Sequence, residues 1–504
     1  MIPIVFAAVI STMHLEADVS ADNGDYVVVP FDVPAGTVEL DFAHVATPAD
    51  VILDFGVWDP SGFRGWGGGL TDATTIGVAE STRGYLPGAI AAGSGWSVTI
   101  GKAKLPNGTG HYAIDLTFRD DVTLTPRARA PYPATVLSPA ARWYRGDLHV
   151  HDVESGDAHA TLDEIITLAR ARKLDFVVLS DHNTISQHAL IAALQASLPD
   201  LLLVRGNEVT TYAGHGGAFG SSAYVDHRIG LDGRTAAQMI ADVDAQGALF
   251  IINHPILDLG TACIGCAWKH DDTPWDMVAA VEIETGNYTQ WKELFETPTL
   301  QYWDTQLDAG HRLAAVGGSD DHRAGQDTSA TGSEVGTPTT VVYAAQLSEA
   351  ALLDGIRHGR TEVALRGPDD PLVELTTADG KAIGDDASGS RVALTAHVTG
   401  GSGLVLELVE NGARTQMATV DSDDWKHTFH VEVPKGGERV RAHLTDGLDA
   451  IVVTSHLWLS YAPSSGCAIA PAHATTSAAL VLVALAALGL FVRRVRRRAR
   501  PATR

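Results

Sequence analysis

The chain has little cysteine, little positive charge and no serine-hydrolase signature. Its 3 cysteines are too few for a cysteine-rich structural zinc site. Its 36 Lys and Arg against 61 Asp and Glu give a net charge of -25, which repels a nucleic-acid backbone, so no nucleic-acid partner is expected. The central, histidine-rich part of the chain has no Gly-x-Ser-x-Gly elbow, which disfavours Ser-His-Asp catalysis there.

The cysteines that are present allow two interpretations. Cys263 and Cys266 form a single Cys-Ile-Gly-Cys pair, and Cys467 stands alone near the C-terminus. A lone Cys-x-x-Cys pair is weak evidence for zinc, and a disulfide that ties a loop is the favoured reading in an exported protein.

The remaining composition is that of a globular protein. Forty-five per cent of the 504 residues are hydrophobic, and the 50 glycines indicate many turns. A chain of this length predicts two to four domains, and the fold class we predict is multidomain α/β with additional β-sheet domains.

The N-terminal part predicts a β-sandwich. Residues 1–20 contain an apolar run of signal-peptide length without preceding basic residues, so a candidate export signal and a first strand are equal alternatives. Residues 21–130 consist of short β-like runs separated by glycine-rich turns, which is typical of a sandwich. The proline-containing stretch 127–133 is expected to be a linker.

Residues 143–367 change to alternating strands and helices. We expect a strand ending at 147–149, helices at 162–172 and near 189–197, and a strand at 176–180. This alternation predicts a mainly parallel sheet, open or closed into a barrel, with functional groups at the C-terminal ends of its strands. Residues 371–461 return to β-like runs and predict a second, small sandwich for support or surface binding.

The tail, residues 464–504, predicts a membrane segment. An apolar run at 477–492 is followed by an arginine cluster, which implies a short transmembrane helix with a cytoplasmic C-terminus. The tail resembles the Gly-Cys, apolar helix and arginine-cluster sorting signals of myxobacterial surface proteins. That resemblance implies export, anchoring in the membrane or display at the cell surface, and a processing protease acting near Cys467.

Eleven of the 21 histidines lie between His149 and His322, where many follow predicted strands and neighbour carboxylates. The His-x-His pair at 149 and 151 can grip one metal ion from the end of a strand. The candidate ligands are His149, His151, Asp157, His182, Glu208, His215, His254, Asp320 and His322. These nine nitrogen and oxygen donors suit two or three divalent ions of zinc, manganese or iron.

The order and spacing of these ligands resemble the polymerase and histidinol phosphatase (PHP) family. The resemblance covers about residues 143–366 and implies a distorted seven-stranded β/α barrel with a trinuclear metal site. The preceding sandwich, with Gly84-Tyr85-Leu86-Pro87-Gly88 before Gly95-Trp96, resembles the leader domain of the CehA/McbA branch.

Carried over position by position, the resemblance implies three metal sites. The first consists of His149, His151, Glu208 and Asp320. The second shares Glu208 and adds His215 and His254. The third consists of Asp157, His182 and His322, with Asp157 standing where some relatives have histidine.

These residues predict a metal-dependent hydrolase acting on a small-molecule ester. Metal-bound water supplies the nucleophile, with Glu208 and Asp320 at the metals and Arg323 or Asn183 as candidates for orienting the substrate. Phosphoester hydrolysis is the first hypothesis. The alternatives are hydrolysis of a carboxylic or carbamate ester at the same site, and a surface binding module with structural metals.

Overall fold

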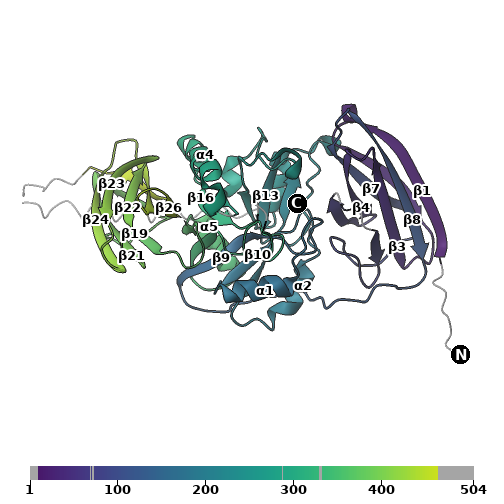
Figure 1. The fold of residues 1–504 in the computed structure, drawn as a ribbon, viewed down its shortest axis with the longest axis horizontal. Coiled ribbons are helices and arrows are strands. Elements are labelled where there is room, and N and C mark those ends of the chain that lie inside the picture. Colours follow the sequence, from purple (N-terminus) through teal and green to yellow (C-terminus); the bar gives the residue numbers. More distant parts are fainter. Residues whose placement is uncertain (1–8, 69, 71–72, 287, 329–331, 464–504) are drawn as a thin grey trace, which may run out of the picture. The chain divides into compact units, whose positions relative to one another are not determined.

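The computed structural model describes residues 9–463, apart from residues 69, 71–72, 287 and 329–331. Within these ranges the protein is multidomain and rich in β-sheet, with few helices (Figure 1). No described helix combines the length and apolar character needed to span a bilayer. The predicted membrane segment and its arginine cluster lie outside the described residues.

The N-terminal domain is a β-sandwich of two four-stranded sheets, shown in purple in Figure 1. Alternating side chains from both sheets, among them Phe42, Phe55 and Trp96, form one core. The first sheet contains β1 (Val9–Ser20), β8 (Thr109–Arg119), β3 (Glu39–Thr47) and β6 (Thr74–Gly77). The second contains β2 (Tyr26–Val33), β7 (Gly93–Lys104), β4 (Ile52–Asp59) and β5 (Gly62–Gly68).

Two boundaries differ from the sequence expectation. Residues 9–20 form strand β1, paired along its length with β8, so the sandwich begins before residue 21. β1 is an edge strand with most of its side chains at least partly exposed, which explains its weak hydrophobic alternation. The stretch 127–133 has no helix or strand, yet Arg127 forms ion pairs with Glu80 and Glu154, so this connection is held against its neighbours.

The central domain contains two sheets whose strand ends meet. One carries parallel β9 (Arg142–Val150), β10 (Phe176–Leu179) and β11 (Leu202–Arg205), flanked by antiparallel β17 (Thr339–Ala344) and β18 (Thr361–Ala364). The other runs β12 (Glu208–Thr211), β13 (Gly214–Phe219), β14 (Leu249–Ile252), β15 (Val278–Thr285) and β16 (Ala314–Gly318). Backbone bridges join Val150 to Asp321 and His182 to Glu208. The two sheets therefore meet at one edge, and residues from both sheets lie there.

The sequence predicts a mainly parallel sheet, but the central domain contains both parallel and antiparallel strand pairs. β12 and β13 are joined by the two residues Tyr212 and Ala213, and so short a connection can only make an antiparallel hairpin. The strands at 176–179 and 142–150 lie where expected. Helices α1 (Leu162–Ala171) and α2 (His188–Gln195) are also confirmed, and Thr161 and Glu164 form a capping box at the start of α1.

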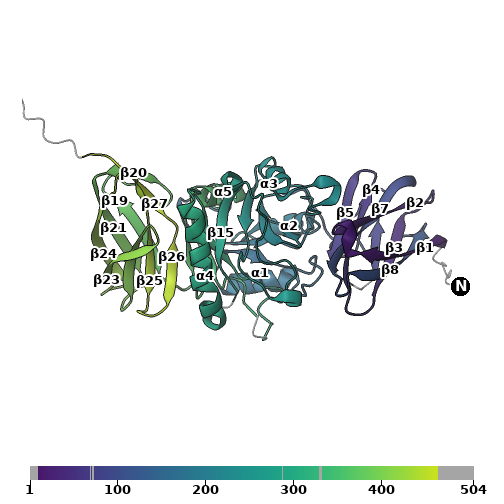
Figure 2. The same ribbon diagram turned by 90° about the horizontal axis from the view of Figure 1, so that it is seen from above.

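Three further helices complete the domain: α3 (Ala236–Asp244), α4 (Tyr288–Asp308) and α5 (Glu349–Arg357). Helix α4 packs along the sheet beside β15, as Figure 2 shows. The indole of Trp303 on α4 is fully buried and donates a hydrogen bond to the carbonyl of Leu313 before β16, which fixes the helix to the sheet.

The C-terminal sandwich shares a sheet with the central domain. β18 pairs with β26 (Ala450–Thr454), and the sheet continues through β25 (Glu438–Thr445) and β22 (Val405–Glu410) to β23 (Ala413–Thr419). β27 (Leu457–Tyr461) pairs with β25, and β20 (Asp386–Gly389) pairs with β27. The facing sheet consists of β19 (Leu372–Thr377), β21 (Arg391–Thr399) and β24 (Asp424–Glu432). Residues 371–461 therefore contribute strands to two facing sheets, and one of these sheets is continuous with the central domain.

A buried ion-pair cluster ties α4 to this sandwich. The carboxylate of Asp304 accepts two hydrogen bonds from the Arg441 guanidinium, at 2.6 and 2.9 Å, and one from Arg439 at 3.1 Å. Both arginine side chains are less than a tenth exposed, so neither charge has full access to water.

We expect Asp304→Ala to lower the free energy of unfolding by about 3–5 kcal/mol, because it leaves the buried Arg441 guanidinium without its counter-ion. Urea denaturation of the full chain measures this. Asp308→Ala is the control, since Asp308 also pairs with Arg439 but is 66% exposed, and its loss should cost only about 0–1 kcal/mol. Equal losses in the two variants would contradict the role given to the Asp304 cluster.

Candidate metal centre

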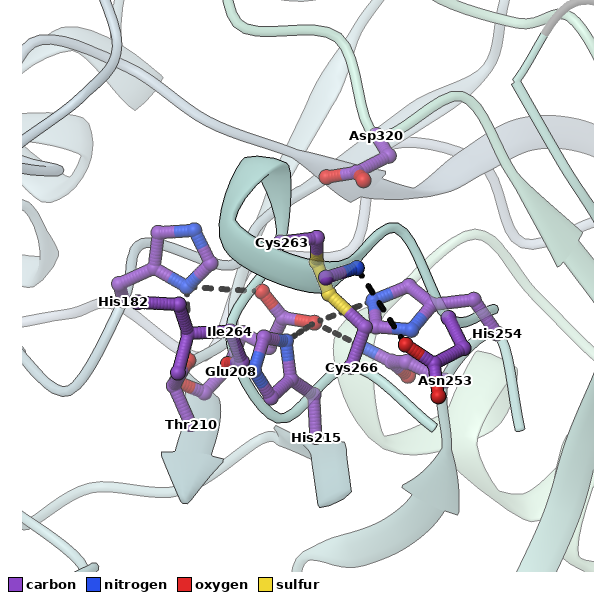
Figure 3. The surroundings of a disulfide bond; sticks show 12 residues. His182, Glu208, Thr210, His215, Asn253, His254, Cys263, Ile264, Cys266 and Asp320 are labelled. Carbon is purple, nitrogen blue, oxygen red and sulfur yellow. Dashed lines mark hydrogen bonds and ion pairs between the residues drawn. A yellow bond between two sulfur atoms is a disulfide. The ribbon is translucent and has the colours of Figure 1, made fainter. Parts of the chain in front are cut away.

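The nine predicted ligands converge at the edge where the two central sheets meet. They come from the ends of β9, β10, β14 and β16, from β12 and β13, and from the loop after β9. Their members are His149, His151, Asp157, His182, Glu208, His215, His254, Asp320 and His322. Figure 3 shows three of the histidines, His182, His215 and His254, directed at the Glu208 carboxylate.

The first cluster contains His149, His151, Glu208 and Asp320. Nε2 of His149 lies 3.3 Å from Glu208 and 3.2 Å from Asp320. Nε2 of His151 lies 3.5 Å from Glu208 and 3.2 Å from Asp320. Two ligands bound at about 2.1 Å to one tetrahedral ion are about 3.4 Å apart, so these separations fit a shared cation.

Buried atoms without hydrogen-bond partners also indicate that the first cluster fits a cation. His149 Nε2, His151 Nε2, Glu208 Oε2 and Asp320 Oδ1 are buried and have no hydrogen-bond partner among the described residues. Buried polar atoms normally have partners, and buried nitrogen and oxygen atoms that face one another without hydrogen bonds are arranged as the ligands of a cation are. The residues present therefore fit a divalent metal ion.

A second cluster shares Glu208. Its Oε1 lies 3.1 Å from His254 Nε2, 3.6 Å from His215 Nδ1 and 3.3 Å from His149 Nε2 of the first cluster, and its Oε2 lies 3.5 Å from His151 Nε2. The Glu208 side chain is fully buried. One carboxylate thus faces two groups of nitrogen ligands, as a bridging ligand must.

A third cluster brings together His151, His182 and His322. Asp157 Oδ2 lies 3.5 Å from Nε2 of both His182 and His322, so the predicted trio is also adjacent. The resemblance assigns His151 to the first cluster alone, whereas its ring here lies within reach of both. The Asp157 side chain is 60% exposed, which makes it the most accessible of the nine ligands.

Hydrogen bonds on the far side of the rings orient four of the histidines. Nδ1 of His149 lies 3.2 Å from Glu282, Nδ1 of His151 lies 3.0 Å from Ser155 Oγ, and Nδ1 of His322 donates to the Asp320 carbonyl at 2.8 Å. Nε2 of His215 donates to the Ile264 carbonyl at 3.2 Å. Anchoring one ring nitrogen leaves the other as the metal ligand.

Two buried carboxylates behind the ligands were not predicted. Glu282 on β15 contacts His149 and accepts a 2.8 Å hydrogen bond from the backbone N–H of His254. Asp147 accepts backbone N–H bonds from His149 and Ser319, both at 3.0 Å, and burial raises its pKa to about 6. The signal in the sequence was a charged residue inside an apolar strand, which does not say which ligand it supports.

The electrostatics of the cluster balance burial against mutual attraction. Burial opposes ionisation of Glu208, but His149 and His182 outweigh it and hold the pKa of Glu208 well below its usual range. Burial likewise disfavours protonated His149, yet Glu208 and Asp320 raise its pKa well above normal. Burial, with His322 and His182 nearby, lowers the pKa of His151 to about 3. Protons on the histidines compete directly with metal ions for this site.

The backbone is strained at two ligands. His254 has a φ of 26° and Asp320 a φ of 54°, in the left-handed region that costs a residue other than glycine about 1–3 kcal/mol. Both residues come shortly after the strands β14 and β16, and they turn their side chains toward the other ligands. Packing elsewhere in the domain has to compensate for this strain.

Asn183 and Arg323, the two candidates for orienting the substrate, differ in their hydrogen bonds. Asn183 lines the pocket and uses its amide to bind the backbone of Thr210 twice, donating at 2.9 Å and accepting at 2.8 Å, so it also fastens β12. Arg323 also lines the pocket.

The ligands open into a pocket of about 750 Å³. Part of its wall comes from the N-terminal sandwich, through Tyr26, Asp54 and Trp66, a contribution that the sequence did not indicate. The Tyr212 hydroxyl donates a 2.6 Å hydrogen bond to Asp54, whose pKa is raised by burial to about 6. The Tyr212 ring also stacks on Tyr26, with ring centroids 5.6 Å apart.

Cys263 and Cys266 form a disulfide, the favoured alternative for this pair. The bond closes a loop that lines the pocket beside His215 (Figure 3).

We expect Glu282→Gln to weaken metal binding about 10–100-fold, because the amide supports His149 less well than the carboxylate does. Competition with a chromogenic chelator measures the affinity. Glu432→Gln, at an exposed position in the C-terminal sandwich, is the matched control and should leave it unchanged. Identical affinities for both variants would exclude a supporting role for Glu282.

Comparisons with known proteins give distant similarities. No protein-family model matches the chain, and no curated protein matches it. A two-domain protein from Bacteroides vulgatus containing a predicted PHP-like metal-dependent phosphoesterase is 18% identical, with a TM-score of 0.36 over 66% of this chain and 100% of its own. A Bacteroides uniformis β-glucuronidase is 10% identical, with a TM-score of 0.20 over 87% of this chain and 61% of its own. At these scores neither similarity carries an argument about this site, which rests on its own geometry.

Proposed function

We propose that the protein is a metal-dependent hydrolase that activates water at a di- or trinuclear centre to hydrolyse a phosphoester. The observation that carries this proposal is the Glu208 carboxylate, buried between two groups of histidine nitrogens at the base of an accessible pocket. The ligand order supports a distorted PHP barrel of the CehA/McbA branch, and the nitrogen and oxygen donors suit zinc, manganese or iron.

The predicted ligands would bind the metal ions in three groups. His149, His151, Glu208 and Asp320 would hold one ion, Glu208 with His215 and His254 a second, and His182, His322 and Asp157 a third. When bound, the ions supply a hydroxide nucleophile near neutral pH and neutralise charge on the substrate oxygens. Arg323 lines the same pocket and is placed to pair with an anionic substrate oxygen.

The pocket wall favours a second candidate, a carboxylic or carbamate ester. Among the described residues that line the pocket, Arg323 is the only arginine or lysine, whereas Asp54 and Asp327 add negative charge. Tyr26, Trp66 and Leu70 offer an apolar surface to an organic group. A neutral ester suits this wall, while a phosphoester depends on the metals for its charge balance.

Export of the protein is a proposal, and so is the alternative that it is a binding module with structural metals. Display at the cell surface, a membrane anchor and a processing protease all depend on residues outside the described part of the chain. A binding module with structural metals is less favoured, because structural sites are usually closed and these ligands face an open pocket.

We expect the metal-loaded protein to hydrolyse p-nitrophenyl phosphate, bis-p-nitrophenyl phosphate or 1-naphthyl N-methylcarbamate, and to lose turnover when a chelator strips the metals. His149→Ala should reduce turnover by more than about 100-fold, which is a larger loss than is typical for a residue that only hydrogen-bonds to a metal ligand. Metal content is measured on the same samples.

His427→Ala, at an exposed histidine of the C-terminal sandwich, is the control and should retain full activity. The substrate that turns over fastest decides between the phosphoester and carbamate candidates. Bound metal without any turnover would favour the binding module, and a chain that binds no divalent metal would overturn the proposal.

A further inference from the structure

The disulfide loop contacts both ligand-bearing segments of the second cluster. The Ile264 carbonyl, between the two cysteines, accepts the hydrogen bond from His215 Nε2. Gly265 lies so close to the β12–β13 turn that a Cβ there would be 2.4 Å from the Thr211 carbonyl oxygen. Just beyond the loop, the backbone N–H of Trp268 donates to the carbonyl of Pro255, next to His254. The loop is thus docked directly on the metal centre.

The sulfur atoms themselves lie close to a ring nitrogen of His215. One ring nitrogen of His215 and the Sγ atoms of Cys263 and Cys266 lie within 4.8 Å of one another. In a tetrahedral zinc site, a thiolate sulfur and an imidazole nitrogen are about 3.6 Å apart and two sulfurs about 3.8 Å apart. Small side-chain rotations reach these values once the disulfide is open, and the Cys-x-x-Cys spacing is that of zinc sites.

We propose that reduction of the Cys263–Cys266 disulfide creates a second kind of metal site, in which both thiolates and His215 bind a thiophilic divalent ion such as zinc. A dithiol supplies the two electrons and two protons that break the S–S bond, and its own thiols close to a disulfide. Each protein thiol then releases its proton to solvent as it binds the ion.

His215 links this site to the hydrolytic centre. In the disulfide form Nε2 carries the proton donated to Ile264, and Nδ1 faces Glu208. A neutral imidazole has one nitrogen lone pair, so it binds one ion at a time. In the reduced site Nε2 becomes the ligand and Nδ1 takes the proton, which removes His215 from the cluster with Glu208 and His254. The loop therefore acts as a redox switch on that cluster.

Cobalt(II) titration of the full chain tests the site. The protein is first stripped of metal and reduced with a dithiol. The excess dithiol is then removed under anaerobic conditions. We expect the Co²⁺-loaded reduced form to show a thiolate-to-cobalt charge-transfer band in the near ultraviolet that the Co²⁺-loaded disulfide form lacks. Cys467→Ser should keep the band, and Cys263→Ser with Cys266→Ser should lose it. An absent band, or one that survives the double substitution, overturns the proposal.

Alkylation of the wild-type chain keeps the test decisive if the double variant does not fold. Zinc should protect Cys263 and Cys266 of the reduced protein from iodoacetamide, as located by mass spectrometry, and equal labelling with and without zinc would refute the site. If the proposed hydrolase function is also correct, zinc-loaded reduced protein loses ester hydrolysis and recovers it on reoxidation. The cobalt and labelling results do not depend on that activity, so the two proposals can fail separately.

Discussion

The central domain depends on one fully buried carboxylate, that of Glu208. A buried negative charge is costly unless cationic or hydrogen-bonding groups surround it, and here Asn253 donates to it at 2.9 Å while histidines approach from both sheets. Its backbone also bridges to His182 across the junction of the sheets. The same residue therefore fixes where the sheets meet and where positive charge must collect. The strain at His254 and Asp320 is a consequence of pointing more ligands at that place.

Most of this site could be predicted from the sequence because the ligands follow strands. Parallel strands such as β9 and β10 end at a common edge, so the order of residues alone places His149, His151 and His182 together. Helices and strands of the first half of the domain were also predictable from their apolar runs. The antiparallel β12–β13 hairpin was missed because strand periodicity says nothing about direction.

What could not be predicted depends on contacts between distant segments. Glu282 supports His149 across 133 residues of sequence, and Asp54 reaches Tyr212 across 158. Neither residue has a local pattern that names its partner. The same holds for the shared position of His151 between two clusters, which depends on how closely β9 and the loop after β16 approach. The pocket wall from the N-terminal sandwich likewise exists only after the two domains have packed.

The pairing of β18 with β26 has a consequence for how this chain can be divided. The two strands exchange hydrogen bonds in the middle of a sheet that begins at β11 and ends at β23. A cut near residue 371 would expose the β18 edge, an unpaired row of backbone donors and acceptors that invites association with other chains. The central domain and its C-terminal neighbour are therefore best expressed together as one unit, even though their sequence patterns differ.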